Sequence, residues 1–417
     1  MSIQQIIARM QNIHNTLLYF IDNESDIEEN FDNFLKICND LQIGEDKHKL
    51  KSLLHLILIL ANDYKRTSTL YKKIDQILQH FSNEIKNFFS NSEIFDIFKK
   101  NKRILLFLLK EKILTVDSYF VNTITENKYL LAKYPRYFLP EIKQFLPNEL
   151  MYMQKEEKSG IDSFYEGYDD SDVDEEKKWI ENIPDEIPEN FEENREKGEN
   201  DSKICEIIRQ DDISRFVQYI TLTNTSLKST FKNSTFETNS FLLKQYQISL
   251  IEYATFFGSN KIFQYLLTKK VNLTNSLWYY AIHGKSSQII NTLIENHIKP
   301  NERYDLYYYY GDEVNEEDVM FLDCLKESVK CHHNGIVDYF CANHFLDEKK
   351  SNSIRFSTSL EYLNFEFFIC EDINESIFFD LCRYNYYSFV DVLLKTKDVD
   401  VNERIKYEQI FIFVFLK

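Results

Sequence analysis

Apolar residues recur along most of the chain at the three- and four-residue spacing of amphipathic helices. One such face in the first part of the chain is formed by Ile74, Ile77, Leu78 and Phe81. The segment Leu53–Leu60 is apolar nearly all round, so we expect a buried helix there. This pattern predicts that residues 1–150 form a helical N-terminal domain.

Two local signals refine this prediction. Ser25-Asp-Ile-Glu28 has the spacing of a capping box, which predicts a helix that begins directly after Ser25. Prolines interrupt the helical pattern between residues 134 and 147, and a residue before proline is biased away from helical geometry. We therefore expect Tyr134–Pro140 to be a structured but non-helical exit from the domain.

The stretch Ser249–Pro300 matches itself without a gap when it is shifted by 27 residues. Tyr253 then falls on Tyr280, and Ala254 falls on Ala281. A fixed offset that preserves apolar positions indicates stacked repeats, and repeats of this length are typical of solenoids.

From residue 203 onward we predict five copies of one two-helix unit. The apolar stripe of each second helix begins at Phe216, Ile262, Ile289, Ile336 and Phe389. The shorter first helices are expected at Ile204–Arg209, Leu250–Phe257, Leu277–His283, Leu322–Val329 and Ile377–Arg383. Only one interval is short, so the other three contain insertions. The same spacing recurs between Ile104 and Ile113, which is compatible with degenerate helix pairs in the N-terminal domain.

These units resemble ankyrin repeats. The best copy is the last, in which Leu381–Leu394 is followed by Asp398–Asn402, similar to the usual Ala-Asp-Val-Asn ending. The usual Thr-Pro-Leu-His opening is absent, and the shortest interval is smaller than the 33 residues of an ankyrin repeat. The resemblance implies an all-α fold with a helical N-terminal domain followed by an ankyrin-like α-solenoid of irregular repeats over residues 203–402.

Nearly the whole chain also resembles a family of trichomonad ankyrin-repeat proteins whose degenerate repeats form a domain of unknown function. The matching stretches are Asn91–Leu108, Ile251–Ser259, Leu277–His283 and Leu325–Asn334. This resemblance implies a fold and a broad class, but no catalytic residue.

The composition changes sharply between the two helical parts. Residues 151–202 are acidic and poor in large aliphatic side chains, so we expect an acidic flexible linker. The net charge of the chain is −18, and this segment carries most of it. Such a charge disfavours nucleic acid or an anionic membrane as a partner.

Cysteine usage and the two ends of the chain bear on location. Seven cysteines without paired spacing, and an N-terminus without a signal peptide, predict reduced thiols and a cytoplasmic protein. No apolar run approaches the length of a membrane span. The apolar tail 403–417 fits no further repeat. It either packs on the last repeat or marks a shortened chain, and the second alternative is slightly favoured.

Two constellations have the residue types of ion sites. Zinc prefers closely spaced ligand pairs, but Cys324 and Cys331 lack a second pair, and His332 and His333 lie at a turn. We expect these four residues to be structural. The segment Asp170–Glu181 has carboxylates at calcium-loop spacing but lacks the glycine of the turn, so a solvated acidic tract is expected. No metal or cofactor is predicted.

The insertion Asn301–Met320 is the strongest candidate for a binding surface. Its tyrosines offer rigid contact area with a polar tip, as in interface hot spots, and the candidates are Tyr304, Tyr307, Tyr308, Tyr309 and Tyr310. The alternative, that they pack on their own repeats, is slightly favoured. Ser171 lies in an acidophilic kinase motif and is a candidate phosphorylation site.

The chain has no nucleophile elbow, phosphate loop or His-Glu-x-x-His motif. The repeats and this absence predict a protein–protein interaction scaffold that is not an enzyme and that binds an unknown protein partner through the concave face and the fingers of residues 203–402. Two alternatives remain. In one, the N-terminal domain has an enzymatic or enzyme-regulatory role and the repeats bring it to its target. In the other, the N-terminal domain is an oligomerisation module. The oligomeric state stays open.

Overall fold

The computed structural model describes residues 2–126, 134–145, 187, 189–245, 247–300, 316–345 and 348–396. Nearly all the regular structure in these segments is helical, which confirms the all-α class. The exception is an antiparallel pair of two-residue strands, β1 (Thr230–Phe231) and β2 (Ile248–Ser249). Within the same segments, no helix is long and apolar enough to cross a membrane.

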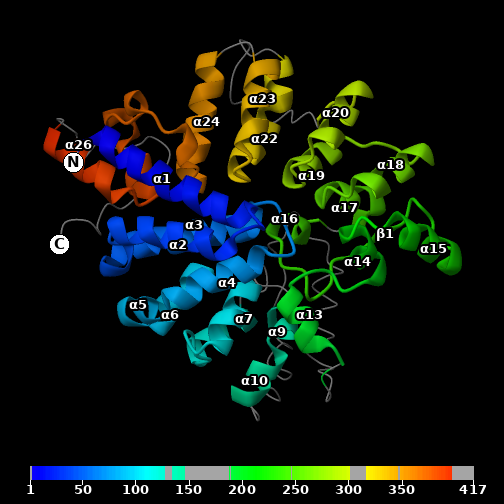
Figure 1. Cartoon of the computed structure of the whole chain (residues 1–417), viewed down its shortest axis with the longest axis horizontal. Helices are drawn as coiled ribbons and strands as arrows, with labels where there is room; N and C mark the ends of the chain where they lie inside the picture. The colour runs from blue at the N-terminus through cyan, green and yellow to red at the C-terminus, as the bar shows by residue number, and fades with distance from the viewer. Residues whose placement is uncertain are drawn as a thin grey trace, which may run out of the picture.

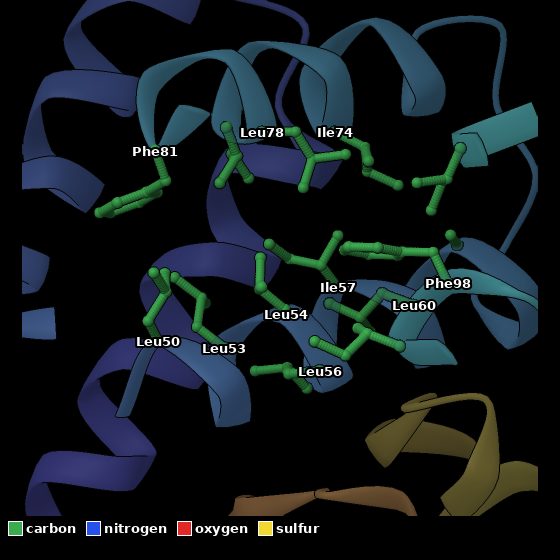
Figure 2. Packing of buried hydrophobic residues seen from close by; sticks show 14 of the residues in the cluster. Leu50, Leu53, Leu54, Leu56, Ile57, Leu60, Ile74, Leu78, Phe81 and Phe98 are labelled. Atoms are coloured by element: carbon green, nitrogen blue, oxygen red, sulfur yellow. The ribbon is translucent and has the colours of Figure 1, made fainter. Parts of the chain in front are cut away.

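Among the N-terminal elements, α3 contacts η1, α4 and α6 (Figure 1). The bounds of the N-terminal elements are α1 (Ile3–Asp22), α2 (Ile27–Asp40), η1 (Ile43–Glu45), α3 (Lys47–Asp63), α4 (Leu70–His80), α5 (Ser82–Phe88), α6 (Asn91–Phe98), α7 (Lys102–Lys110), α8 (Ser118–Glu126), α9 (Tyr134–Tyr137) and α10 (Leu139–Phe145). The expected buried helix at Leu53–Leu60 is the central part of α3. Figure 2 shows its leucines facing Ile74 and Leu78 of α4, with Phe98 of α6 beside Leu60.

The predicted capping box at Ser25 is wrong. The N-cap of α2 is Asp26, which has a left-handed φ of 50° and makes no side-chain cap bond. This backbone turn leaves Ser25 one residue outside the cap position. Capping boxes do form where the serine has extended geometry, at Ser2, Ser90 and Ser249.

The prediction of a non-helical exit at Tyr134–Pro140 is also wrong. Pro135 and Pro140 lie in the first turns of α9 and α10. A proline is tolerated in the first turn because its missing N–H would have no partner within the helix there.

The last part of the expected flexible linker is an ordered helix, α13 (Phe191–Lys197), packed against α7. Arg195 is buried, donates to the carbonyl of Tyr137 at 3.0 Å and pairs with Glu141 at 2.7 Å. Phe191 is buried against Phe236. One buried ion pair and one aromatic anchor thus hold a segment whose composition alone favours disorder. Most of the rest of the expected linker lies outside the described residues.

The following helices include the five predicted pairs. Their bounds are α14 (Lys203–Arg209), α15 (Ile213–Thr223), α16 (Ser240–Leu243), α17 (Leu250–Phe256), α18 (Asn260–Thr268), α19 (Leu277–His283), α20 (Ser287–Glu295), α22 (Glu316–Lys330), α23 (Asn334–His344), α24 (Glu348–Tyr362), η3 (Phe365–Phe367), η4 (Cys370–Asp372), η5 (Glu375–Ile377), α25 (Phe378–Arg383) and α26 (Tyr387–Thr396). The pairs in contact are α14–α15, α17–α18, α19–α20, α22–α23 and α25–α26.

The first helices of four units lie side by side, in the order α14, α17, α19 and α22. The next neighbour of α22 is α24, which is inserted before the last unit. The closest approach within the row is between α17 and α19, where Gly284 faces the carbonyl of Thr255 without a side chain between them.

Two apolar cores hold these helices. One extends from α14 to α23 and includes Ile354 of α24 and Phe367 of η3. The other begins in α1 and continues into α24–α26, where Phe356, Leu360, Phe389 and Leu393 are buried together with the N-terminal helices. The last repeat unit therefore packs against the first helix of the chain, and Figure 1 shows α26 beside α1.

Candidate functional site

Three ligand-type side chains converge where α19 meets α22. His283 ends α19, and Glu327 and Cys331 are four residues apart at the end of α22, so they share one helical face. Their possible ligand atoms all lie within 4.8 Å of one another, the one such group of three found in the described part of the chain.

Asp63, at the end of α3, and Lys330 complete this group. The Nε2 atom of His283 donates to Oε1 of Glu327 at 2.8 Å, and Lys330 Nζ donates to the same oxygen at 2.9 Å. Lys330 Nζ is also 3.2 Å from Oδ1 of Asp63. We refer to Asp63, His283, Glu327, Lys330 and Cys331 as the junction cluster, because it joins α3 to the repeat helices.

The charges of the junction cluster balance one another in a buried setting. Burial by itself raises the pKa of Glu327, but its hydrogen bond with His283 and the charges of His283 and Lys330 outweigh burial and lower that pKa to about 2. Burial raises the pKa of Asp63 against the opposing effect of Lys330. Burial opposes the charge of Lys330, but the carboxyl groups of Asp63 and Glu327 raise its pKa above the ordinary value.

Cysteine, histidine and carboxylate are also the members of a nucleophilic triad. Cys331 Sγ lies 3.5 Å from Nδ1 and 3.7 Å from Nε2 of His283. A thiol in line with the lone pair of one nitrogen would be much farther from the other, so the sulfur lies beside the ring instead. Cys331 is fully buried, and burial raises the pKa of its thiol well above the usual value. This arrangement does not activate a nucleophile.

The donor set does not fit a bound metal ion either. Zinc accepts cysteine, histidine and carboxylate ligands. The ammonium group of Lys330, however, lies on the Glu327 oxygen that a cation would need, and the Cys331 sulfur is not in line with a nitrogen lone pair of His283. The junction cluster is therefore a charge-balanced polar contact between helices.

Aromatic packing from α16 completes the junction. The ring of Phe241 stacks on His283 with centroids 4.3 Å apart, and also packs against Phe256 and Tyr280. The next residue back along the chain, Ser240, donates to Asp63 at 3.1 Å. Thus α16 lies between the N-terminal helix α3 and the first helices of two repeat units.

The four residues weighed as metal ligands from the sequence do not meet as a set. Of these, Cys331 belongs to the junction cluster, and Cys324 is buried within α22. His332 hydrogen-bonds to His14, and His333 donates to the carbonyl of Ile282.

Sequence reasoning missed His283 and Glu327. The available signal was the repeat itself, because the 27-residue offset places His283 where the preceding unit has the buried Phe256. A polar residue at an apolar repeat position indicates a special contact.

The other sequence candidates lie outside the described residues. These are the insertion tyrosines Tyr304, Tyr307, Tyr308, Tyr309 and Tyr310, the candidate phosphorylation site Ser171, and the tail 403–417.

No family model matches this chain, and neither a curated protein nor a solved structure matches it.

Proposed function

We propose that the protein is an interaction scaffold without catalysis, in which ankyrin-like repeat units bind a protein partner through their second helices. The observation that carries this proposal is the unequal burial of the two helices in a unit. The first helices α17 and α19 each bury every residue except one, whereas the second helix α18 buries only Ile262, Phe263 and Leu266.

The side of the first helices is already occupied by the chain itself. In Figure 1, α14, α17 and α19 face the N-terminal helices, while α15, α18 and α20 lie on the outer side. The contacts of α16 and the junction cluster fill the space between α3 and the first helices. This differs from the concave inner face, which a repeat array of ankyrin type was expected to offer. The reason is that Phe241 of α16 packs against Phe256 of α17 and Tyr280 of α19, so α16 covers the inner side of the first helices.

The outer side has the composition of a binding surface. Leu222 of α15 is 77% exposed, and Tyr219 of α15, Tyr265 of α18 and Tyr339 of α23 are partly buried against the core. Leu222, Tyr219 and Tyr265 on the neighbouring helices α15 and α18 offer apolar area with polar tips, which suits a protein partner. Because α15 contacts α18, this surface extends over more than one unit.

The interior of the N-terminal helices also supports a role without catalysis. Figure 2 shows leucine, isoleucine and phenylalanine side chains filling the space around α3. The buried titratable groups Asp63 and His14 of this domain contact Lys330 and His332, whereas an enzymatic domain would require such groups in a polar pocket. The resemblance to degenerate ankyrin-repeat proteins is part of the same proposal, as are a cytoplasmic location and binding by the insertion tyrosines.

Site-directed photo-crosslinking tests this proposal. A crosslinking amino acid is placed at Leu222 on the outer side or, as a control, at Tyr119 of α8, which is 42% exposed. In extracts of the source cells, we expect a specific protein adduct from position 222 of the full chain and none from position 119. An adduct from position 119 alone, or from neither position, would contradict binding through the repeats.

A further inference from the structure

A pair of buried histidines joins the first helix of the chain to the repeat array. His14 of α1 and His332, which follows α22, are almost completely buried. Nε2 of His14 lies 2.8 Å from Nδ1 of His332, and Nε2 of His332 lies 2.9 Å from the carbonyl oxygen of Tyr362 at the end of α24. Two imidazoles thus connect three helices.

The partners of these rings determine where the protons lie. The carbonyl of Tyr362 can only accept, so Nε2 of His332 carries the hydrogen. In a neutral ring, Nδ1 of His332 is then an acceptor, and Nε2 of His14 must donate to it. Nδ1 of His14 is left as a buried lone pair that has no hydrogen-bond partner.

The ring of His333, the next residue along the chain, also has one nitrogen that donates to a carbonyl and one that has no partner. Its Nδ1 donates to the carbonyl of Ile282 at 2.7 Å, and its Nε2 is buried without a partner. The ring packs edge-on against Tyr64 of the N-terminal part, with centroids 5.2 Å apart. Protonation would therefore place an N–H without an acceptor on the buried Nδ1 of His14 or Nε2 of His333.

The surroundings offer no carboxylate to a protonated ring. Among the described residues, the charged and titratable groups that act on His332 are His14 and His333, and those on His333 are Lys285, His283 and Lys65. The neighbour of His14 from η3 is the uncharged ring of Phe365, 5.7 Å away. The carboxylate of Asp22 is already bonded to Tyr64 and Lys285.

We propose that His14, His332 and His333 form an acid-sensitive latch, which holds α1 and Tyr64, at the end of α3, against the repeat array while the three rings are neutral and releases them when the rings are protonated. An extra proton on the His14–His332 pair keeps their hydrogen bond, but it leaves a buried positive charge and places an N–H on Nδ1 of His14, where no acceptor is present. A proton on Nδ1 of His14, or on Nε2 of His333, would create a buried cation without an acceptor. This latch is independent of which face binds a partner.

The direction of the pH dependence follows from burial. Burial lowers the pKa of His14 to about 4 and, together with neighbouring positive groups, lowers those of His332 and His333 well below the ordinary value. The open junction therefore binds more protons than the closed one below a pH of about 6.5. Closure is fully favoured above that pH and weakens as the pH falls, by up to roughly tenfold per pH unit for each histidine.

Hydrogen exchange of the full chain between pH 7.5 and 5 tests the latch, after correction for the intrinsic exchange rate. We expect the protection of α1 and of the turn at residues 331–333 to fall by about tenfold or more per pH unit below 6.5. Helices α6 and α7, which do not contact the latch, serve as the internal reference. Protection of α1 that does not change with pH would overturn the proposal.

Substitution separates the latch from other acid effects. His14→Gln can still donate an amide hydrogen to His332 but does not titrate, so we expect a weaker pH dependence in α1. His80→Gln, which replaces an exposed histidine, should leave the wild-type profile unchanged. If His14→Gln does not fold at pH 7.5, His333→Gln is used with residues 331–333 as the readout, because its amide can still donate to Ile282 and the ring packs on Tyr64 rather than on α1. A wild-type pH profile in the folded variant would overturn the latch.

Discussion

At the residue scale, Lys330 is the side chain on which the junction cluster depends. Its ammonium group bridges Asp63 and Glu327 at 3.2 and 2.9 Å, and its side chain is only 13% exposed. Two carboxylates can be buried near each other here because both Lys330 and His283 counter their charge.

We expect Lys330→Met to lower the free energy of unfolding by about 3–5 kcal/mol, because it leaves buried carboxylates uncompensated while keeping most of the volume. Urea denaturation at pH 7 measures this loss. The control is Lys395→Met, which removes an exposed pair with Asp391 and should cost less than about 1 kcal/mol. Equal effects of the two substitutions would show that the junction cluster is not charge-balanced by Lys330.

Glu327 gives the junction cluster a pH dependence of its own. Its pKa in the folded protein is about 2, below the ordinary value of 4.5, because His283 and Lys330 outweigh the opposing effect of burial. A carboxyl group with a lowered folded-state pKa contributes stability above its ordinary pKa, and this is lost as the pH falls towards 2.

We therefore expect the difference in unfolding free energy between wild type and Glu327→Gln to be constant from pH 7 to 5. It should shrink below pH 4.5, by up to about 3 kcal/mol over the whole window down to pH 2. Urea denaturation at pH 7, 5, 4 and 3 measures the difference, with the exposed carboxylate of Glu361, changed to Gln, as the control. A difference that does not change with pH would rule out the lowered pKa.

At the element scale, all five units turn between their helices through a residue with left-handed backbone. These residues are Asp211, Gly258, Lys285, His332 and Asn385, with φ between 49° and 64°. Only one is glycine, although this conformation is costly for other residues. In several units, the side chain at this position reaches a neighbouring element. Asp211 accepts backbone N–H groups of Lys261 and Ile262 at the start of α18, whose own N-cap makes no side-chain bond.

This contact predicts a different response to glycine at equivalent turn positions. Asn385→Gly should be neutral or stabilise the protein by up to about 1 kcal/mol, because glycine tolerates the left-handed backbone. Asp211→Gly gains the same relief but loses the cap of α18, so we expect it to be less stable than Asn385→Gly by about 1–2 kcal/mol. Thermal denaturation compares the two, and faster hydrogen exchange at Lys261 and Ile262 should accompany Asp211→Gly alone.

The contact between α17 and α19 depends on a glycine. A Cβ atom at Gly284 would lie 2.3 Å from the carbonyl oxygen of Thr255, so Gly284→Ala must push the two helices apart. We expect a loss of about 1–3 kcal/mol, as for other overpacked contacts. In Gly335→Ala the new methyl group meets nothing within 4 Å, and alanine favours helix α23 by up to about 1 kcal/mol. Equal unfolding midpoints for the two variants would contradict this packing.

At the scale of the whole molecule, the last described helices pack against the first helix of the chain. The core of the N-terminal helices includes side chains of α24–α26, and α1 contacts both η3 and α26. Gln11 of α1 donates to the carbonyls of Phe365 and Phe368 at 3.2 and 3.3 Å. The last repeat unit should therefore lose structure together with α1.

Hydrogen exchange of two core variants tests this coupling. Phe389→Ala, in the core shared with α1, and Leu293→Ala, in the core of the central units, should each cost about 2–5 kcal/mol. We expect Phe389→Ala to accelerate exchange in α1 under conditions in which α14 and α17 remain protected. Leu293→Ala should do the reverse. If α1 responds equally to both variants, the two cores unfold as one unit and the predicted separation is wrong.

Much of the helical structure follows from the sequence because apolar spacing is a local property. The first helix of the third unit was predicted at Leu277–His283 and is observed with the same bounds, and the first helix of the second unit differs by one residue. The errors at Ser25 and Tyr134 are local too. A left-handed backbone at Asp26 and prolines in first turns follow the same residue preferences but place the helix ends differently.

The sequence by itself determined the class of fold and the positions of the repeat helices, since both depend on residues within a few turns of one another. Only the tertiary structure decided which side chains meet. His14 and His332 are 318 residues apart, Ser240 and Asp63 are 177 apart, and His283 and Glu327 are 44 apart. Such contacts depend on how the helices cross and on the return of α26 to α1, and no local pattern contains that information. The junction cluster and the histidine latch both depend on such contacts between helices that are far apart in the sequence.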